Sequence, residues 1–245
     1  MSALAKFNWL RAIASLLYPP ACTICSASVA ASEYLCAACD ANVIRIVPPF
    51  CAKCSEPFAG AISGAFTCAN CAHQTLHFDA AVAAYRSRGI VRRVILDFKY
   101  GRQIHLRHPV ARWLLAALDD DRLRGHRFNI IIPVPLHPKR LRWRGFNQSV
   151  LLARQISHAY KIPMDPFVLR RDHETAPQTQ LAEDERRKNV RGAFTLNPDR
   201  SVDGKNILLV DDVYTSGATV NECSRILKRN GSKQVFVVTL ARAVS

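Results

Sequence analysis

The sequence ILLVDDVYTSGAT, residues 207–219, places two adjacent aspartates between four apolar residues and a small loop of hydroxyl side chains and glycine. A short, branched and uninterrupted apolar run is typical of a strand buried on both faces of a parallel sheet. Because ligands of open α/β sheets bind outside the carboxyl ends of the strands, we expect Asp211 and Asp212 to face a ligand. Residues 220–228 have helical spacing, so residues 215–219 should supply hydroxyls and backbone N–H groups at a helix N-terminus. That combination suits a phosphate.

Composition and charge limit the classes of protein to which this chain can belong. Its 245 residues, 49% of them hydrophobic, are enough for one main core and a smaller module. The formal net charge of +15 predicts attraction to phosphorylated metabolites, nucleic acid or anionic membrane surfaces, and charge alone does not choose among them. No apolar run is long enough to span a bilayer and the N-terminus has no clear export cleavage site, so we expect a cytoplasmic protein. Apolar residues at helical spacing between residues 4 and 17 predict a helix packed on its own domain, in preference to a membrane-surface helix.

Eight of the nine cysteines form four C-x-x-C pairs, which are CTIC at 22–25, CAAC at 36–39, CAKC at 51–54 and CANC at 68–71. A C-x-x-C turn places two thiolates on one side of a tight knuckle, and two knuckles supply the four soft ligands of a tetrahedral structural zinc. The sequence therefore predicts two zinc ions. Their spacing assigns Cys22, Cys25, Cys36 and Cys39 to one ion, and Cys51, Cys54, Cys68 and Cys71 to the other. An interleaved pairing, first with third and second with fourth, stays open at this point.

Disulfide and redox chemistry explain the cysteine pairs less well. A disulfide framework requires export, and a thioredoxin-like C-x-x-C occurs once near a βαβ pattern rather than four times in tandem. A closed site of four cysteines has no open coordination position, so both ions should stabilise or recognise rather than catalyse. His73 and His77 follow the last pair and are not needed as ligands. Cys223 shares a helical face with Val220 and Leu227 and is expected to be a buried packing residue.

From about residue 78 onward, strand and helix patterns alternate, which predicts a three-layer α/β fold with a mainly parallel sheet flanked by helices. We therefore divide the chain into residues 1–77, an N-terminal helix with the double zinc module, and residues 78–245. Strands are expected at 80–85, 129–135, 205–212 and 234–241, and helices at 90–98, 110–118, 148–160 and 220–228. The charged stretch 173–194 is too long for an ordinary connector and is interpreted as a lid.

A basic loop, PVPLHPKRLRWRGFNQS, begins at Pro133 at the end of an expected buried strand. Its cations are Lys139, Arg140, Arg142 and Arg144, which together have the charge to hold a diphosphate. A solvated cationic turn is the simpler alternative, but four cations on a proline-rich segment beside the two acids favour anion binding. Lys99 is equally compatible with a further cation of the site and with a surface lysine that ends a helix.

ILLVDDVYTSGAT resembles the phosphoribosyl-diphosphate (PRPP) binding motif of type I phosphoribosyltransferases, in which four hydrophobic residues precede two acids and a T-x-G-x-T loop. Three further features narrow the resemblance, and these are RGFNQS at 144–149, the T-x-x-Q-x-x-L spacing of Thr175, Gln178 and Leu181, and RKNVRGAF at 187–194. Together with the double zinc ribbon, they make nearly the whole chain similar to the ComF and GntX group. That group joins a zinc ribbon to a type I phosphoribosyltransferase domain.

The resemblance implies a site, a metal and a reaction. Asp211 and Asp212 would act as the catalytic acids that bind the ribose hydroxyls of PRPP. The 5′-phosphate would lie on Thr215, Ser216, Gly217, Ala218 and Thr219. Mg²⁺ would bridge ribose and diphosphate, while Lys139, Arg140 and Arg144 would contact the diphosphate that leaves as positive charge develops on the sugar. The implied activity is magnesium-dependent phosphoribosyl transfer to an acceptor that the sequence does not identify.

Two other functions compete with this interpretation. A Walker-B interpretation of LLVDD fails, because the chain has no G-x-x-x-x-G-K-[ST], and no G-x-G-x-x-G supports a dinucleotide fold. The stronger rival is a non-catalytic role, in which the PRPP site acts as a sensor or scaffold and the partners are single-stranded DNA or competence proteins. ComF-type proteins are associated with natural transformation and DNA uptake, and the basic surplus and Trp143 within RLRWRGF are compatible with nucleic-acid contact. Turnover separates the two hypotheses, because only the enzyme releases pyrophosphate.

Overall fold

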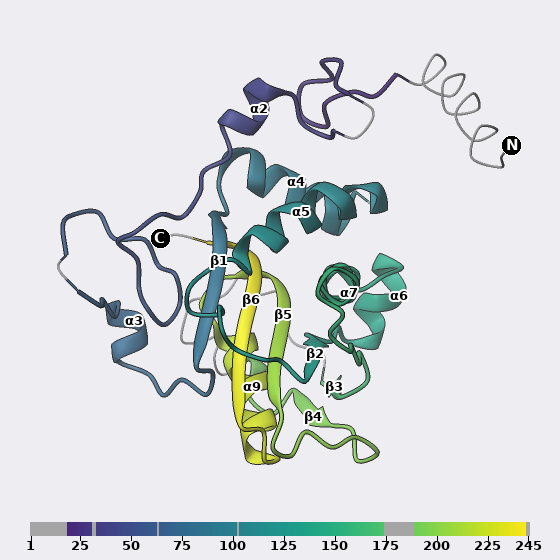
Figure 1. The fold of residues 1–245 in the computed structure, drawn as a ribbon. Helices are drawn as coiled ribbons and strands as arrows, with labels where there is room; N and C mark the ends of the chain where they lie inside the picture. The colour runs from purple at the N-terminus through teal and green to yellow at the C-terminus, as the bar shows by residue number, and fades with distance from the viewer. Residues whose placement is uncertain (1–18, 31–32, 63, 102, 174–188, 244–245) are drawn as a thin grey trace, which may run out of the picture.

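The computed structural model describes residues 19–30, 33–62, 64–101, 103–173 and 189–243 (Figure 1). The expected N-terminal helix at 4–17 lies outside the described residues. So does most of the expected lid at 173–194, with Thr175, Gln178 and Leu181. In the part of the chain that the structure describes, no helix combines the length and apolarity needed to cross a membrane.

A four-stranded parallel sheet forms the centre of the fold. Its strands lie in the order β1 (Ala80–Arg86), β6 (Gln234–Arg242), β5 (Asn206–Tyr214) and β2 (Ile130–Pro133). Successive side chains of β5 point to opposite faces of the sheet. Leu208 and Val210 therefore join one buried cluster, and Ile207 and Leu209 join the other. Burial on both faces explains the uninterrupted apolar run.

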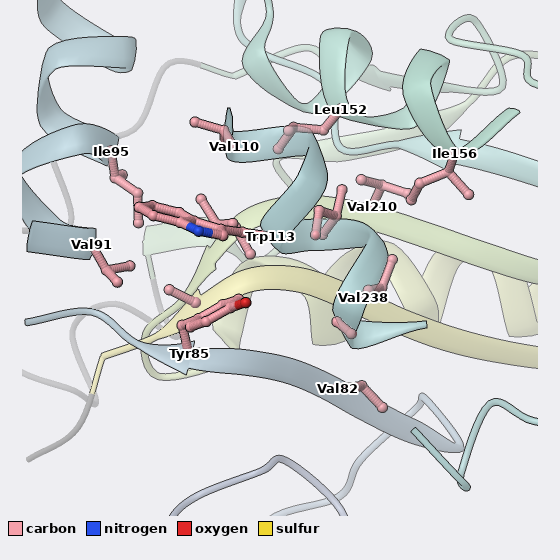
Figure 2. Packing of buried hydrophobic residues seen from close by; sticks show 14 of the residues in the cluster. Val82, Tyr85, Val91, Ile95, Val110, Trp113, Leu152, Ile156, Val210 and Val238 are labelled. Atoms are coloured by element: carbon pink, nitrogen blue, oxygen red, sulfur yellow. The ribbon is translucent and has the colours of Figure 1, made fainter. Parts of the chain in front are cut away.

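Helices cover the two faces of the sheet unequally (Figure 1). One face packs against α4 (Gly89–Tyr100), α5 (Arg107–Ala117) and α7 (Gln148–Tyr160), and the 3₁₀ turn η1 (Ile104–Leu106) leads into α5. Trp113 of α5 lies over this face with Tyr85 and Val210 around it (Figure 2). Burying such a side chain stabilises the fold by roughly 1.5–3 kcal/mol. The other face packs against α9 (Ala218–Arg229) and a two-stranded antiparallel sheet of β3 (Leu169–Arg171) and β4 (Phe194–Leu196).

The sequence prediction of an α/β fold with a mainly parallel sheet is confirmed, and the expected helix at 148–160 coincides with α7. Three details differ. The basic loop forms a short helix, α6 (Pro138–Arg144), whose first turn is capped by His137 accepting from the Lys139 N–H at 3.4 Å. The small antiparallel sheet of β3 and β4 was not expected. Strand β5 continues to Tyr214 because β6 runs beside it, with Tyr214 opposite Arg242.

Candidate functional site

Two groups of four cysteine thiols each converge in the structure. The first tetrad is Cys22, Cys25, Cys36 and Cys39, and the second tetrad is Cys51, Cys54, Cys68 and Cys71, with all sulfurs of a group within 4.8 Å of one another. The Cys25–Cys36 and Cys54–Cys68 sulfur pairs are 3.6 Å apart. Four Zn–S bonds of about 2.3 Å would place tetrahedral sulfurs about 3.8 Å apart, so both tetrads fit zinc. Neighbouring pairs combine, and the interleaved alternative does not occur.

One cysteine of each tetrad, Cys22 and Cys51, is stabilised as a thiolate, while burial and the neighbouring thiols raise the pKa values of Cys39, Cys54 and Cys71. Burial opposes ionisation of Cys22, but backbone N–H groups at Cys25, Cys36 and Ile24 lower its pKa to about 6. In the second tetrad the Cys68 N–H donates to the Cys51 sulfur at 3.3 Å. Two very short helices, α2 (Ala37–Ala41) and α3 (Ala69–Ala72), begin directly after Cys36 and Cys68. None of the nine cysteines, all within the described ranges, forms a disulfide.

Histidines stay out of both tetrads, and Cys223 behaves as expected. Neither His73 nor His77 joins a group of potential metal ligands among the described residues. Cys223 is fully buried in the cluster that α9 forms with the sheet, and this burial raises the pKa of its thiol well above the ordinary value. It is therefore a packing residue of the core.

Asp211 and Asp212 lie at the carboxyl edge of the sheet. Strand β2 ends at Pro133, opposite Val210, so β5 carries both acids beyond the end of its neighbour. The Asp211 Oδ1 atom accepts from the Ser149 hydroxyl at 3.0 Å and from the Asp212 N–H at 2.9 Å. Lys99, at the end of α4, lies with its Nζ 2.7 Å from the Asp212 Oδ1 atom. The ambiguity over Lys99 is thereby resolved, because its ammonium group is a cation of the site.

The two carboxylates are not fully compensated by this one lysine. Burial, followed by the negative charge of Asp212, raises the pKa of Asp211 to about 7, although Lys99 acts in the opposite direction. The Asp212 Oδ2 atom is buried and has no hydrogen-bond partner in the described structure. An unsatisfied buried carboxylate oxygen is costly, so the pair is prepared to accept hydroxyl donors or a cation.

The loop that follows β5 turns through Gly217 into α9. Gly217 has a φ of 80° and is the N-cap residue of this helix, and a Cβ at this position would overlap the ring of Tyr214. Only glycine combines that backbone conformation with so close an approach. The loop, residues 215–219, therefore presents the N-terminus of a helix of 12 residues. Backbone N–H groups and the helix dipole at such an end favour a phosphate.

These groups border one cavity of about 590 Å³. Of the residues that the sequence predicted for the site, Asp211, Asp212, Thr215, Thr219, Arg140 and Arg144 line this cavity. Ser216 and Ala218 are buried beneath the loop and, like Gly217, do not line it. Lys139 is exposed on α6 and is not among the lining residues. The structure thus brings the acids, part of the loop and two arginines together, and leaves Lys139 outside.

Sequence reasoning missed several groups that line the cavity. Arg171, on β3, is buried beside it, and burial together with the positive charge of Arg140 lowers the pKa of its guanidinium. Ser149, the hydroxyl that holds Asp211, lies inside the RGFNQS motif, so its place in the first turn of an expected helix after a strand was a usable signal. No local pattern marked Arg171, because β3 reaches the cavity only through tertiary packing.

Aromatic side chains stand at one side of the cavity. Tyr100 and Trp143 line it with their ring centroids 6.1 Å apart, and the Arg144 guanidinium lies 5.0 Å from the centroid of the Tyr100 ring. Both rings are exposed, Tyr100 to 51% and Trp143 to 61%. The cavity therefore has an acidic edge, a basic wall and an open aromatic side.

Comparisons with known proteins agree with this arrangement. Residues 13–76 match the family described as "Double zinc ribbon domain", and residues 147–245 match the "Phosphoribosyl transferase domain". The chain is 32% identical to "Competence protein F" of Haemophilus influenzae over 217 residues, which is 87% of this chain and 92% of that protein. It is 30% identical to "DNA utilization protein YhgH" of Salmonella typhimurium over 232 residues, 94% of this chain and 100% of the relative. "Competence protein ComFC" of Streptococcus pneumoniae is 25% identical over 212 residues, covering 85% and 87%.

Proposed function

The chain belongs to the family of competence protein F, with a double zinc ribbon and a phosphoribosyltransferase domain, and on that premise we propose that its cavity binds PRPP with Mg²⁺ and transfers the phosphoribosyl group to an acceptor, releasing pyrophosphate. One observation carries the proposal. Two acids, a helix N-terminus and two arginines predicted from separate motifs line the same cavity of about 590 Å³.

Each part of PRPP has a complementary group in the cavity. The Asp212 Oδ2 atom lacks a partner and would accept a hydrogen bond from a ribose hydroxyl, with Asp211 beside it. The 5′-phosphate would lie at the loop of residues 215–219, on backbone N–H groups and the Thr215 and Thr219 hydroxyls. The diphosphate would face Arg140 and Arg144, whose planar guanidinium groups suit phosphate oxygens. Lys139 would act only through its charge at longer range.

The residues present also fit a divalent cation. Two carboxylates lie side by side with a single lysine against them, and one buried carboxylate oxygen is unsatisfied. Asp211 and Asp212 would hold Mg²⁺ next to PRPP, where the ion would neutralise the diphosphate. Ser149 keeps Asp211 oriented, and Lys99 limits repulsion between the two acids.

The chemistry expected of these side chains is electrostatic. Loss of pyrophosphate leaves positive charge on the sugar, which the carboxylates of Asp211 and Asp212 would stabilise. The leaving diphosphate gains negative charge, which Arg140 and Arg144 would stabilise. Acidic and basic groups that line one cavity would thus meet the two charges that develop together.

The eight paired cysteines complete the proposal as ligands of two structural zinc ions. Four cysteines per ion leave no position for substrate, so the ions would stabilise the N-terminal region, residues 1–77, against the domain at 78–245. The metal content of the purified full chain, expected at about two zinc ions, tests this part by elemental analysis.

Binding of PRPP tests the main proposal. In calorimetry with Mg²⁺, we expect Asp211→Asn/Asp212→Asn to weaken PRPP binding by at least about 100-fold, because two charged contacts are lost. Asp121→Asn, at an exposed carboxylate, is the matched control and should bind normally. Pyrophosphate release should then be screened across nucleobases and amines. If the wild type does not bind PRPP, the proposal is wrong. If it binds PRPP but releases no pyrophosphate with any acceptor, only the transfer step is wrong.

A second function, binding of single-stranded DNA, is favoured by the open aromatic side of the cavity. Trp143 and Tyr100 are exposed next to arginines, and bases stack on such rings at about 1–3 kcal/mol each. We expect Trp143→Ala to weaken binding of a single-stranded oligonucleotide about tenfold. Phe167→Ala, at a similarly exposed ring on another part of the surface, is the control. Fluorescence anisotropy at several salt concentrations measures the affinity of each variant for the oligonucleotide. Equal affinities would exclude the aromatic side of the cavity as the binding site for single-stranded DNA.

A further inference from the structure

The second tetrad is attached to the edge of the sheet. The Ala81 N–H of β1 donates to the Lys53 carbonyl at 2.8 Å, within the CAKC turn. The Ser55 hydroxyl donates to the Ala81 carbonyl at 3.0 Å and accepts from the Ala83 N–H at 3.2 Å. Strand β1 is an edge strand, so the turn occupies backbone groups that would otherwise be unpaired. Figure 1 shows α3 on this side of the sheet, beyond β1.

One chain of contacts runs from this turn to Tyr214, directly before the phosphate loop, residues 215–219. Glu56, which follows the turn, forms an ion pair with Arg242 at the end of β6. Arg242 is buried, and its guanidinium lies 4.5 Å from the centroid of the Tyr214 ring. That ring is the surface against which Gly217 is packed. A displacement of the CAKC turn would therefore be transmitted to the residue that shapes the loop.

A second chain of contacts reaches Asn221, directly after the same loop. Asn221, in the first turns of α9, accepts from the His77 N–H at 2.7 Å and donates to the Thr75 carbonyl at 2.9 Å. Thr75 and His77 belong to the segment that leaves the second tetrad after Cys71. The backbone N–H of Asn221 in turn donates to the Gly217 carbonyl at 2.8 Å. The segment that follows the first cysteine pair of the tetrad and the segment that follows its last cysteine are thus both connected to the loop.

The first tetrad is attached at other positions. Tyr34 stacks on His108 of α5 with ring centroids 6.0 Å apart, and Asp40 lies 4.0 Å from Arg112. The segment that follows Cys39 also pairs with β1, where the Ile46 N–H donates to the Ala84 carbonyl and the Arg86 N–H donates to the Ile44 carbonyl, both at 2.9 Å. None of these contacts includes a residue of the loop 215–219, nor Tyr214 or Asn221 beside it.

We propose that the second tetrad positions the phosphate loop, and that Glu56, Arg242 and Asn221 are the positioning residues that connect them. The metal state of this tetrad would then set the affinity of the cavity for the phosphate of a sugar phosphate, without touching the ligand. The inference rests on the proposed function only in taking residues 215–219 as the phosphate site. It assigns to one cysteine group a role in ligand binding beyond stability.

Two variants of the full zinc-loaded chain test the proposal, because replacing the cysteines themselves risks loss of the fold. Glu56→Gln weakens the first connection, Asn221→Ala removes the second, and Asp40→Asn at the first tetrad is the control. Ribose 5-phosphate and pyrophosphate are titrated separately by calorimetry. We expect each test variant to bind ribose 5-phosphate about tenfold more weakly and pyrophosphate less than about twofold more weakly, since only the loop is disturbed. The Gly217 amide resonance should also shift in both ligand-free variants and not in the control.

The outcomes are distinct. Unchanged ribose 5-phosphate binding with an unmoved Gly217 resonance overturns the proposal, and so does equal weakening for both ligands, which would indicate a general defect. Asn221→Ala leaves no buried charge unpaired, so it supplies the test if Glu56→Gln does not fold. If the wild type binds neither ribose 5-phosphate nor PRPP, the proposed function fails. In that case a shift of the Gly217 resonance in the two test variants still supports the connection between tetrad and loop, and an unchanged resonance contradicts it.

Discussion

The acidic edge and the basic wall of the cavity are built in opposite ways. Asp211 and Asp212 are neighbours on one central strand, half-buried or buried, and held by Ser149 and Lys99. The arginines come from separate elements, Arg140 and Arg144 from the short helix α6 and Arg171 from β3. The acids therefore have nearly fixed positions, whereas the basic wall depends on how α6 and the small sheet of β3 and β4 pack against the central sheet.

This difference suits the two ends of the proposed ligand. Ribose hydroxyls are directional donors and gain from acceptors fixed by a sheet, while a diphosphate has many equivalent oxygens that several guanidinium groups can share. Acidic and basic side chains both line the cavity. Substitutions on the two sides should therefore affect different ligands, and the following experiments test that separation.

The largest effect is expected at the loop beside the acidic edge. Gly217→Ala combines an unfavourable positive φ with overlap of the new Cβ and the buried Tyr214 ring, so the loop must move. We expect ribose 5-phosphate binding to fall at least about 100-fold, with a lower melting temperature. Gly204→Ala also has a positive φ, of 66°, but open space around it, and it should bind normally. Calorimetry and thermal unfolding of both variants measure this, and equal binding would contradict our description of the loop.

A smaller effect, on pyrophosphate instead of ribose 5-phosphate, is expected on the basic wall. Arg140→Gln removes a guanidinium from the cavity lining and should weaken pyrophosphate binding about tenfold, with ribose 5-phosphate changed less than about twofold. Arg142→Gln, on the exposed side of the same helix, removes an identical charge outside the cavity. The pair thus separates a local contact from the general positive field. Similar losses in the two variants would mean that field, rather than contact, holds the diphosphate.

An effect on stability rather than on binding is expected from the proton on the acidic edge. The pKa of Asp211 is about 7, above the value of 3.8 expected in the unfolded chain. The folded state therefore binds the proton more strongly, and the stability that this proton contributes, complete below about pH 4, is lost as pH rises through about 7. The free energy of unfolding of Asp211→Asn, compared with that of the wild type, should therefore rise by on the order of 2 kcal/mol from about pH 5 to about pH 8, with solvent screening taken into account. Urea unfolding at both pH values measures it, and a pH-independent difference would contradict the raised pKa.

The sequence predicted the parts of this molecule that depend on neighbouring residues. Repeated C-x-x-C spacing predicted both tetrads, and the apolar run before Asp211 predicted a central strand, because each pattern is local. Arg171 and the ion pair of Lys99 with Asp212 depend on tertiary packing, which no local pattern encodes. Lys139 was predicted from the charge of its proline-rich segment and from the resemblance, yet it is exposed on α6 and does not line the cavity. The roles of the site residues and the division at residue 77 stay predictions.

The same contrast explains why two identical motifs differ. Nothing in CTIC or CAKC predicts which turn hydrogen-bonds to the sheet edge, because the partner groups on β1 become neighbours only in the folded chain. The second tetrad is buried throughout, whereas Cys25 of the first is exposed. Zinc binding can therefore be predicted from spacing, but the connection of a zinc site to a ligand loop cannot.

Titration of ribose 5-phosphate and pyrophosphate without Mg²⁺ into Asp211→Asn/Asp212→Asn and into Arg140→Gln tests most directly whether the acids and the arginines recognise different parts of the ligand. We predict crossed results, in which the double acid variant loses ribose 5-phosphate but keeps pyrophosphate, and the arginine variant keeps ribose 5-phosphate but binds pyrophosphate weakly. Parallel losses of both ligands in both variants would show that the two sides of the cavity do not recognise different parts of one molecule.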